Sequence, residues 1–304
     1  MSAKRKQARF VVAMIAIFSI FLAFLWSVVG TDLDSFLWQR FEPLNLTLWR
    51  TKKQDSVFTS SPSVPASKCF LFLHGSGSTP QQSWRDFFYE SSKRDAVLWN
   101  KAHLVAPVLD EIPGFKNFDF SMVLAELNKK TESGPIKGNC KKWIVTGNSL
   151  GAWLAFLFAE KFPEKTESIV VINSVGLDRE YPVVERVFEN PTPASISFLH
   201  YSSFYKAPEI PFWFWVAVSE ILKKETKPMP KEKSPFLLDS RLKNIEAPTL
   251  LIWGLADRAI PNLTEDFKKL MPGIKVIELA QCGHTPQVEC FDQVKKEIEK
   301  FTGL

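Results

Sequence analysis

The chain has 304 residues, of which 45% are hydrophobic, 13% aromatic and 23% charged, so it is too apolar for a disordered or fibrous protein and fits one large globular domain or two small ones. Its net charge of +5 comes mostly from Lys4, Arg5, Lys6 and Arg9, which leaves +1 for residues 31–304 and argues against a nucleic-acid partner. Four cysteines exclude a disulfide-dense scaffold, and no CxxC or HExxH pattern indicates a metal site.

The first feature along the chain is an apolar segment, residues 11–30, which contains no ionisable side chain. Twenty helical residues extend about 30 Å, the thickness of the hydrocarbon core of a bilayer, so we predict a transmembrane anchor here. A cleaved signal peptide is the alternative, although its apolar region is usually only about 7–15 residues long and Val28-Val29-Gly30 is a poor match to a cleavage site. A buried core helix is disfavoured because the segment has no polar face.

Charges on the two sides of this segment predict its orientation. The basic residues precede it and Asp32 and Asp34 follow it, which is typical of a cytoplasmic N-terminus. We therefore expect a single-pass membrane protein whose main domain lies on the extracytoplasmic side. Signal cleavage would instead give a periplasmic or secreted protein.

Short apolar runs and helical stretches alternate in the rest of the chain. The runs are typical of strands buried on both faces, as in a parallel sheet, and they lie at residues 69–73, 103–108, 143–146, 168–172, 249–253 and 275–279. The predicted helices are 121–130, 150–161, 263–270 and 287–301. This alternation predicts a three-layer α/β domain with right-handed crossovers. Between residues 176 and 246 the chain becomes rich in Pro, aromatic residues and Lys, which we interpret as an inserted cap.

The stretch Gly147-Asn148-Ser149-Leu150-Gly151 lies between a predicted buried strand and a predicted apolar helix. A tight turn there would hold Ser149 above the sheet, and glycines are needed two residues to either side because side chains would collide where strand and helix converge. The alternative is a glycine-bracketed turn with an inert serine. The strand before it and the helix after it favour a nucleophile.

A serine nucleophile needs a histidine to take its proton, and the chain offers four. His103 begins a predicted strand and His200 lies in the aromatic insert, so structural roles are expected for both. His74 ends a buried strand and is expected to hold its loop through hydrogen bonds. His284 follows the last predicted strand among small neighbours, and we predict that it is the general base.

The acid that orients this histidine is predicted to be Asp257, in the loop after the strand at 249–253. In a parallel sheet this loop, the His284 loop and the serine turn all open at the same edge. Asp178 is the rival acid, and an exposed ion pair with the neighbouring Arg258 is the non-catalytic alternative for Asp257.

Two N–H donors are needed to stabilise a tetrahedral oxyanion. One is predicted to be the backbone N–H of Leu150, directly after the nucleophile and at a helix N-terminus. The second is predicted to be the N–H of Ser76, with Gly77 as the fallback, in the Gly/Ser loop at 74–78. A phosphate-binding loop is disfavoured because the lysine of a P-loop is missing.

Four motifs in this order, HGSGS, GNSLG, WGLADRAIP and CGHTPQVE, resemble the α/β-hydrolase superfamily across roughly residues 45–304. The resemblance implies an α/β-hydrolase fold: a mostly parallel eight-stranded sheet with helices on both faces and a helical cap at about 176–246. The core would occupy 68–304, after a membrane-proximal segment with the first strands at 31–67. Ala152 and Cys290 depart from the usual glycine and proline at their positions.

Two groups within the superfamily are similar to this chain. The anchor, the short cap and the stretch NSVGL resemble membrane-anchored monoacylglycerol-lipase-like hydrolases, whereas HGSG and GNS also resemble hydrolases that cleave carbon–carbon bonds in ring-cleavage products. The implied reaction is acyl transfer to serine followed by hydrolysis of the acyl-enzyme, with no metal or organic cofactor.

Aromatic residues in the cap, Trp213, Phe214 and Trp215 among them, suit an apolar substrate arm if they line the active site. They could equally form the cap's own core, or touch the bilayer. The cap lysines at 223, 224, 227, 231 and 233 are read as a solvated face, with anionic lipid headgroups as the alternative.

The superfamily topology implies that the strands near residues 69 and 143 are neighbours, which brings Cys69 close to Cys140. A Cys69–Cys140 disulfide is therefore possible in an oxidising compartment, and Cys282 and Cys290, on either side of His284, can pair similarly. A Cα separation above 7 Å would rule out the first pair.

The function we predict is that of a membrane-anchored serine hydrolase acting on small-molecule or lipid carboxylic esters. A carbon–carbon bond hydrolase and a non-catalytic α/β-hydrolase domain used for binding are the alternatives. The sequence gives no indication of the oligomeric state.

Overall fold

The computed structural model describes residues 57–60, 66–92, 99–132, 140–225 and 234–304. The chain divides into two compact units, Met1–Gln54 and Asp55–Leu304, and all the described residues belong to the second. The predicted basic flank and transmembrane anchor at 1–30 lie outside the described residues. Among the helices that the structure does describe, none has the length and apolar character needed to cross a bilayer.

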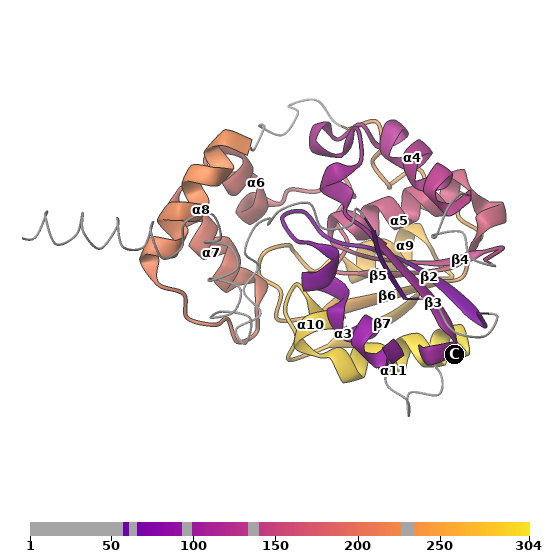
Figure 1. Ribbon diagram of the computed structural model, residues 1–304. Coiled ribbons are helices and arrows are strands. Elements are labelled where there is room, and N and C mark those ends of the chain that lie inside the picture. Colours follow the sequence, from indigo (N-terminus) through magenta and orange to yellow (C-terminus); the bar gives the residue numbers. More distant parts are fainter. Residues whose placement is uncertain (1–56, 61–65, 93–98, 133–139, 226–233) are drawn as a thin grey trace, which may run out of the picture. The chain divides into compact units, whose positions relative to one another are not determined.

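A mostly parallel sheet forms the centre of the second unit (Figure 1). The described residues form seven strands in the order β1-β3-β2-β4-β5-β6-β7, in which β1 runs antiparallel to β3 and every other neighbouring pair is parallel. The strands are β1 (Val57–Ser60), β2 (Lys68–Leu73), β3 (Ala102–Pro107), β4 (Trp143–Asn148), β5 (Thr166–Ile172), β6 (Thr249–Gly254) and β7 (Lys275–Leu279). All six predicted strands are confirmed. Eight strands were expected, and residues 31–56 of the segment expected to hold the first strands lie outside the described residues.

Helices cover both faces of this sheet (Figure 1). One face packs against α4 (Phe120–Glu132), α5 (Leu150–Lys161) and α9 (Thr264–Leu270), and the other against α3 (Pro80–Ser92) and α11 (Phe291–Thr302). Successive strand side chains point to opposite faces, so Leu71 joins the first core cluster while Phe72 joins the second. Burial on both faces explains why the strands are apolar without alternation.

Three of the four predicted helices are confirmed as continuous elements, and two differences from the prediction stand out. The expected helix at 287–301 is divided into α10 (Pro286–Glu289) and α11 because Cys290, whose side chain is bonded to Cys282, leaves the helical conformation with φ −131° and ψ 40°. Helix α3 was not predicted. Short 3-10 turns lie at Trp99–Lys101, Leu109–Glu111, Phe115–Asn117, Pro163–Lys165 and Leu242–Asn244.

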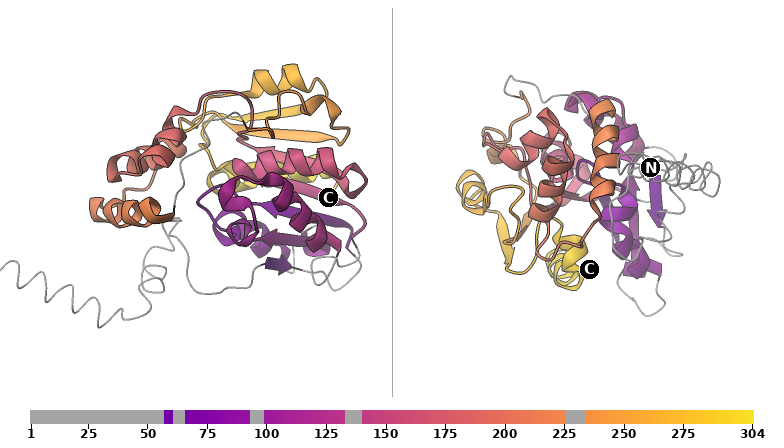
Figure 2. Two further views of the ribbon diagram at one scale, coloured as in Figure 1. Left: turned by 90° about the horizontal axis from the view of Figure 1, so that it is seen from above. Right: turned by 90° about the vertical axis from the view of Figure 1, so that its left-hand side faces the viewer.

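Between β5 and β6 the residues that the structure describes form three α-helices, α6 (Pro182–Glu189), α7 (Pro193–Ser203) and α8 (Phe212–Glu225), which lie together at one end of the unit (Figure 2). They fall within the stretch predicted as a cap. Helix α7 starts at a capping box in which the Thr192 and Ser195 side chains each bond the other residue's backbone N–H.

Both disulfides considered from the sequence are present. The Cα atoms are 6.0 Å apart in Cys69–Cys140 and 6.1 Å apart in Cys282–Cys290. The first links β2 to the residues before β4, and the second closes the loop that carries His284.

Candidate active site

Ser149 occupies the turn between β4 and α5. Its backbone has φ 56° and ψ −118°, a conformation that is costly for a residue with a side chain and that holds the side chain away from both elements. The Ser149 N–H donates to the carbonyl of Ile172 at the end of β5, 2.9 Å away. The serine is half-buried at the carboxyl edge of the sheet.

The glycines on either side of this turn are required by close backbone contacts. A Cβ atom at Gly147 would lie 2.2 Å from the carbonyl oxygen of Gly151. One at Gly151 would lie 2.2 Å from the carbonyl oxygen of Leu73, at the end of β2. The collision expected from the sequence is therefore present at both positions, and at Gly151 the obstacle is a third element.

Asp257 and His284 lie in direct contact, although 27 residues separate them. The His284 Nδ1–H donates to Asp257 Oδ2 over 2.7 Å. The Asp257 side chain has no exposed surface and that of His284 is 14% exposed. Asp178, the rival acid, is exposed, and its backbone N–H donates to Asp239.

Each carboxylate oxygen of Asp257 has two donors. Oδ1 accepts the N–H groups of Ala259, at 2.8 Å, and Ile260, at 3.2 Å, while Oδ2 accepts the amide of Asn173 at 2.8 Å besides His284. This arrangement fixes the carboxylate and leaves no acceptor site for water. The ion pair with Arg258 considered as an alternative is not found, because the Arg258 guanidinium donates to the carbonyl of Tyr201.

The environment of His284 shifts its proton affinity. Burial is the largest influence and lowers the pKa of the imidazole, but the charge and hydrogen bond of Asp257 and the charge of Glu289 together raise that pKa above its usual 6.5. Because Nδ1 is the donor to Asp257, the neutral ring carries its free lone pair on Nε2. Such a ring can accept a proton at Nε2 and is stabilised when it does.

Two asparagines hold the three loops together. The Asn148 amide donates to the carbonyl of His284 at 2.9 Å and to that of Ile172 at 3.2 Å. Asn173, with φ 41°, accepts the N–H of Gly254 at 2.9 Å while its amide donates to Asp257. Sequence reasoning missed both roles. Asn148 ends β4 and Asn173 directly follows β5, and these positions at the carboxyl edge of the sheet were the available signal.

The loop after β2 passes beside Ser149. A Cβ atom at Gly75 would lie 3.3 Å from the Cβ of Ser149, and residues 75–78 form a turn closed by the Ser78 N–H and the Gly75 carbonyl at 3.4 Å. Gly77 has φ 72°, and the exposed Ser76 is the residue before it. The other predicted oxyanion donor is the N–H of Leu150, and Leu150 is the first residue of α5.

His74 supports this loop in the manner expected. Its Nε2 accepts the N–H of Leu109 at 2.9 Å, so its Nδ1–H donates to the Gly75 carbonyl at 2.8 Å. Burial lowers the pKa of this ring, against the opposing effects of the Gly75 hydrogen bond and the charge of Asp110. His74 is thus a neutral structural bridge.

The remaining histidines pack among aromatic rings. His103 is buried beside Trp143. His200 in α7 lies against Trp215, and its Nε2–H donates to the Pro208 carbonyl at 3.1 Å. Burial lowers the pKa of His200 despite the opposing hydrogen bond to Pro208.

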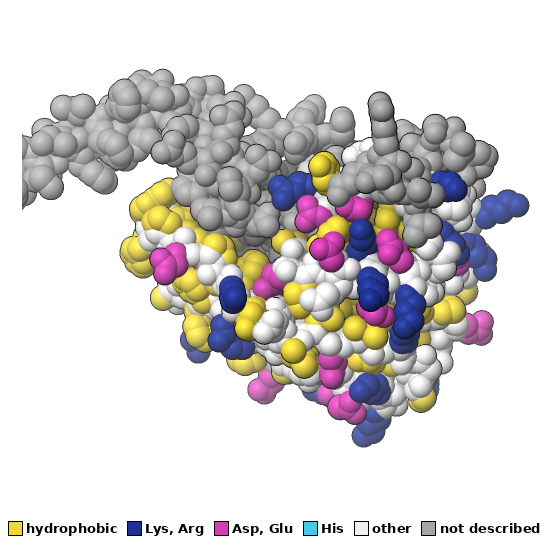
Figure 3. Space-filling view, turned by 90° about the horizontal axis from the view of Figure 1, so that it is seen from below, with side chains coloured by type: hydrophobic (Ala, Val, Ile, Leu, Met, Phe, Trp, Pro, Cys, Tyr) yellow, Lys and Arg dark blue, Asp and Glu magenta, His cyan; other side chains and the backbone are white. Residues whose placement is uncertain are grey.

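The cap aromatics proposed as substrate contacts divide into two groups. Phe214 and Trp215 are 6% and 5% exposed and pack on each other inside the cap, whereas Trp213 is 54% exposed. Apolar side chains also gather on the surface over the cap end of the unit (Figure 3), where Phe212, Val216 and Ile221 are exposed besides Trp213.

Comparison with known proteins places the chain in a family. The model of the alpha/beta hydrolase family matches residues 70–297. Lipase 3 of Moraxella sp. (strain TA144) is 25% identical over 226 residues, which are 66% of this chain and 69% of the lipase.

Solved structures show the same fold. A bacterial membrane phospholipase A, described as a virulence factor, has a TM-score of 0.62 and 22% identity, with 97% of this chain and 98% of that chain covered. A 2-hydroxy-6-oxo-6-phenylhexa-2,4-dienoate hydrolase from Rhodococcus sp. strain RHA1 has a TM-score of 0.63 and 18% identity, with 78% and 91% covered. The chain belongs to the alpha/beta hydrolase family and is a hydrolase.

Proposed function

We propose that this protein is a serine hydrolase of carboxylic esters, with lipid esters such as monoacylglycerols as the substrate class. The observation that carries the proposal is the buried Asp257–His284 hydrogen bond at the sheet edge where Ser149 occupies its strained turn. A positioned imidazole with a free Nε2 is what a serine hydroxyl needs in order to become a nucleophile.

In the proposed reaction, His284 Nε2 removes the proton of Ser149 as its Oγ attacks the ester carbonyl. Asp257 stabilises the imidazolium that forms and keeps the ring in the required tautomer. His284 then gives the proton to the departing alcohol, which leaves an acyl-enzyme on Ser149. Water, deprotonated by the same imidazole, hydrolyses that intermediate.

The oxyanion of each tetrahedral intermediate is proposed to accept the N–H of Leu150 and the N–H of Ser76, or that of Gly77. The N–H of Leu150 benefits from the helix N-terminus of α5, which favours negative charge. The close approach of Gly75 to Ser149 supports a role for the adjoining turn.

A lipid-like ester is supported by two observations. The similar proteins include one named lipase and a membrane phospholipase A of known structure. The cap, whose α7 contacts the loops of Asp257 and His284, also carries exposed aromatic side chains. A surface of this kind suits an acyl chain better than a charged substrate.

A panel of substrates tests the reaction class. We expect p-nitrophenyl esters of increasing acyl length to be hydrolysed, with higher kcat/KM for medium or long chains than for acetate. Turnover of a vinylogous diketone with no ester hydrolysis would favour a carbon–carbon bond hydrolase. No turnover of either class by folded protein would favour a binding domain.

We also propose that the enzyme is anchored by residues 11–30 with its catalytic unit outside the cytoplasm. The uncharged segment after a basic cluster supports this topology, as do the two disulfides, since disulfides persist in oxidising compartments. The full chain is expected in the carbonate-washed membrane fraction and a chain lacking residues 1–30 in the soluble one. Equal distribution of the two forms would contradict the anchor.

A further inference from the structure

The C-terminal end of cap helix α7 is held by the two loops that carry Asp257 and His284. The His284 N–H donates to the Ser203 carbonyl at 2.6 Å, and Arg258 donates to the Ser202 carbonyl through its backbone N–H, at 2.9 Å, and to that of Tyr201 through its guanidinium, at 2.8 Å. The last carbonyls of a helix lack partners within it, so these loops supply the donors that the helix needs. The cap and the candidate active site therefore share one hydrogen-bond network.

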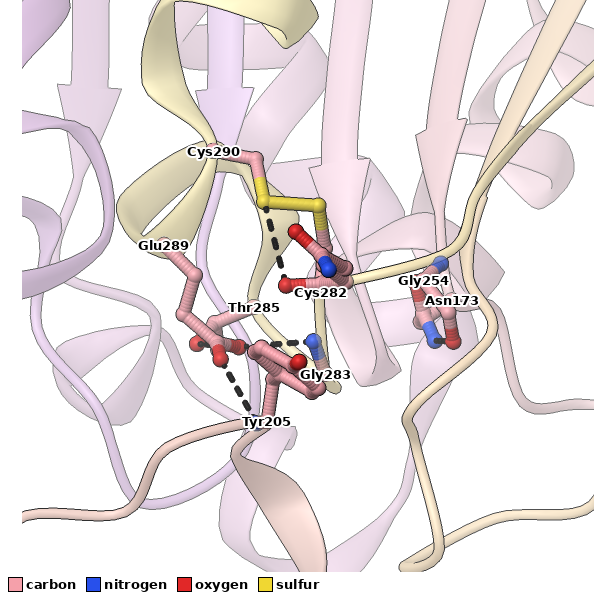
Figure 4. Close-up of a disulfide and its surroundings, with 9 residues drawn as sticks. Asn173, Tyr205, Gly254, Cys282, Gly283, Thr285, Glu289 and Cys290 are labelled. Atoms are coloured by element: carbon pink, nitrogen blue, oxygen red, sulfur yellow. Dashed lines mark hydrogen bonds between the residues drawn. A yellow bond between two sulfur atoms is a disulfide. The ribbon is translucent and has the colours of Figure 1, made fainter.

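Glu289, at the end of α10, closes this network from the other side (Figure 4). Its Oε2 accepts the N–H of Tyr205, just after α7, at 2.8 Å, and its Oε1 accepts the N–H of Gly283 at 3.0 Å. The Thr285 hydroxyl is 3.5 Å from the same Oε1. One carboxylate thus bonds residues on both sides of His284 and the backbone of the cap.

The contact between the base loop and the cap is close enough to depend on glycine. A Cβ atom at Gly283 would lie 2.2 Å from the carbonyl oxygen of Ser203 and 2.8 Å from the Cα of Phe204. A small displacement of the residues after α7 would therefore reach the backbone next to His284 directly.

We propose that Glu289 is a positioning residue that fastens the His284 loop to the cap, so that the imidazole is held in its reactive position only while the end of α7 is docked. The inference rests on the proposed role of His284 as general base. It assigns Glu289 no contact with the substrate; its effect passes through the Gly283 and Tyr205 backbones.

The Cys282–Cys290 disulfide makes this role separable from folding of the loop. It joins the two ends of the loop covalently whether or not Glu289 is present. Loss of the carboxylate should consequently loosen the loop from the cap without unfolding it.

The charged and titratable groups in the contacting elements are Asp257 and Arg258 of the acid loop, Glu289 itself, and His200, Tyr201, Tyr205 and Lys206 of the cap. Of these, Asp257 and Glu289 raise the pKa of His284. Burial in turn raises the pKa of Glu289, opposed by the N–H donors and by His284. Neutralising Glu289 should therefore lower the pKa of His284, which moves the acid limb of kcat/KM to lower pH.

Glu289→Gln is the first test variant, assayed on the full chain. Glutamine has one carbonyl oxygen, so its amide group would face one of the two N–H donors, and either the Gly283 or the Tyr205 bond is lost. We expect kcat to fall about 10- to 100-fold, KM to change little for a small ester, and the acid limb to shift downwards. Fluorophosphonate labelling at Ser149 should slow in parallel, and circular dichroism should be unchanged.

The matched control is Glu299→Gln in α11, a half-buried carboxylate that accepts the indole N–H of Trp99 at 2.6 Å. The carbonyl oxygen of glutamine can still accept this N–H, so the variant exchanges a charge-assisted hydrogen bond for a weaker neutral one, away from the candidate active site. It should cost some stability while leaving kcat and the pH profile unchanged.

A second pair of variants removes the cap side of the contact alone. Tyr205→Pro lacks the N–H donor, and Tyr205→Ala keeps it while also losing the ring. Phe204, with φ −116° and ψ 147°, already has the extended conformation that a following proline demands. We expect kcat of Tyr205→Pro to be at least about fivefold below that of Tyr205→Ala.

If Glu289→Gln labels at the wild-type rate and the acid limb of its kcat/KM does not move, the inference is overturned. If Glu289→Gln fails to fold, equal kcat in the two Tyr205 variants overturns it instead. Should the wild-type enzyme neither label nor turn over, the proposed function itself fails, and that outcome is distinct from both.

Discussion

At the scale of single residues, the four hydrogen bonds to Asp257 decide what this carboxylate can do. Its two oxygens accept hydrogen bonds from the N–H groups of Ala259, Ile260, Asn173 and His284, and none of the side chain is exposed. A carboxylate held in this way keeps its position and orientation while the neighbouring imidazole gains and loses a proton.

The direction of the His284 pKa shift gives a pH prediction. The base acts in its neutral form, so activity is lost as the pH falls through the pKa of His284, which lies above 6.5. We expect the acid limb of kcat/KM for a soluble ester to have its midpoint above that value. A midpoint clearly below 6.5 would show that another group controls the limb.

Asp257→Asn should lower kcat by about 10⁴-fold, because asparagine removes the charge that stabilises the imidazolium and can favour the wrong tautomer. The acid limb of the residual activity should also move to lower pH. Asp178→Asn, which alters the exposed rival acid, is the control. If the Asp178 variant lost activity while the Asp257 variant kept it, the assignment of the acid would be reversed.

Much of the candidate site was predictable at this scale, because each motif residue lies where a buried strand ends. Asn173 also lies where a strand ends, but the sequence does not show that its amide meets Asp257, 84 residues away. Glu289 was not predictable, because its partners are the backbone N–H groups of Gly283 and Tyr205. Backbone N–H groups leave no pattern in a sequence.

At the scale of elements, the crossing of β2, β4 and α5 determines how the serine turn is built. Gly147 meets the first turn of α5, while Gly151 meets the end of β2. The helix can approach the sheet this closely only because neither residue has a side chain.

Gly151→Ala should therefore destabilise the fold by about 1–3 kcal/mol and reduce activity, because the Leu73 carbonyl or α5 must move. Gly273→Ala is its control, since a Cβ atom there meets nothing within 4 Å. That variant should be within about 1 kcal/mol of the wild type. Urea unfolding measures both, and equal stability of the two variants would contradict the packing described.

Helix α3 was not predicted, although its sequence carries the pattern of a buried helical face. Trp84, Phe87, Phe88 and Ser91 of α3 follow the i, i+3, i+4, i+7 spacing of a buried helical face, so the signal was present. The break between α10 and α11 at Cys290 gave no such signal. It coincides with the disulfide to Cys282, and the spacing of the cysteines alone did not determine which of them pair.

At the scale of the whole unit, one disulfide stabilises the core and the other stabilises the loop that carries His284. Cys69–Cys140 has a sequence separation of 71 residues and links core elements, whereas Cys282–Cys290 has one of 8 and encloses His284. Chain entropy assigns the longer closure the larger effect on stability, about 4 kcal/mol against about 2–3 kcal/mol.

Replacing each pair by alanine should separate stability from activity. The Cys69/Cys140 variant is expected to lose more free energy of unfolding, and the Cys282/Cys290 variant more kcat, because the second bond fixes the ends of the base loop. Denaturant unfolding and ester hydrolysis give the two rankings. If the Cys69/Cys140 variant lost more of both the free energy of unfolding and kcat, the base loop would be held in place without its disulfide.

The fold itself was predictable because the alternation of fully buried strands and helices leaves few arrangements for a chain of this length. The placement of the cap was not, because α7 is positioned by hydrogen bonds from Arg258 and His284 to its own backbone. Helices α7 and α8 carry exposed as well as buried apolar residues, which obscures the periodicity that would reveal their packing.

Labelling with a fluorophosphonate tests the central claim most directly, since the probe forms a covalent bond with a serine only when a base activates it. The folded wild-type protein should label with one probe per chain, on the peptide that contains Ser149, and Ser149→Ala should not label. Unlabelled wild type with native circular dichroism, or labelling retained in Ser149→Ala, would contradict the account.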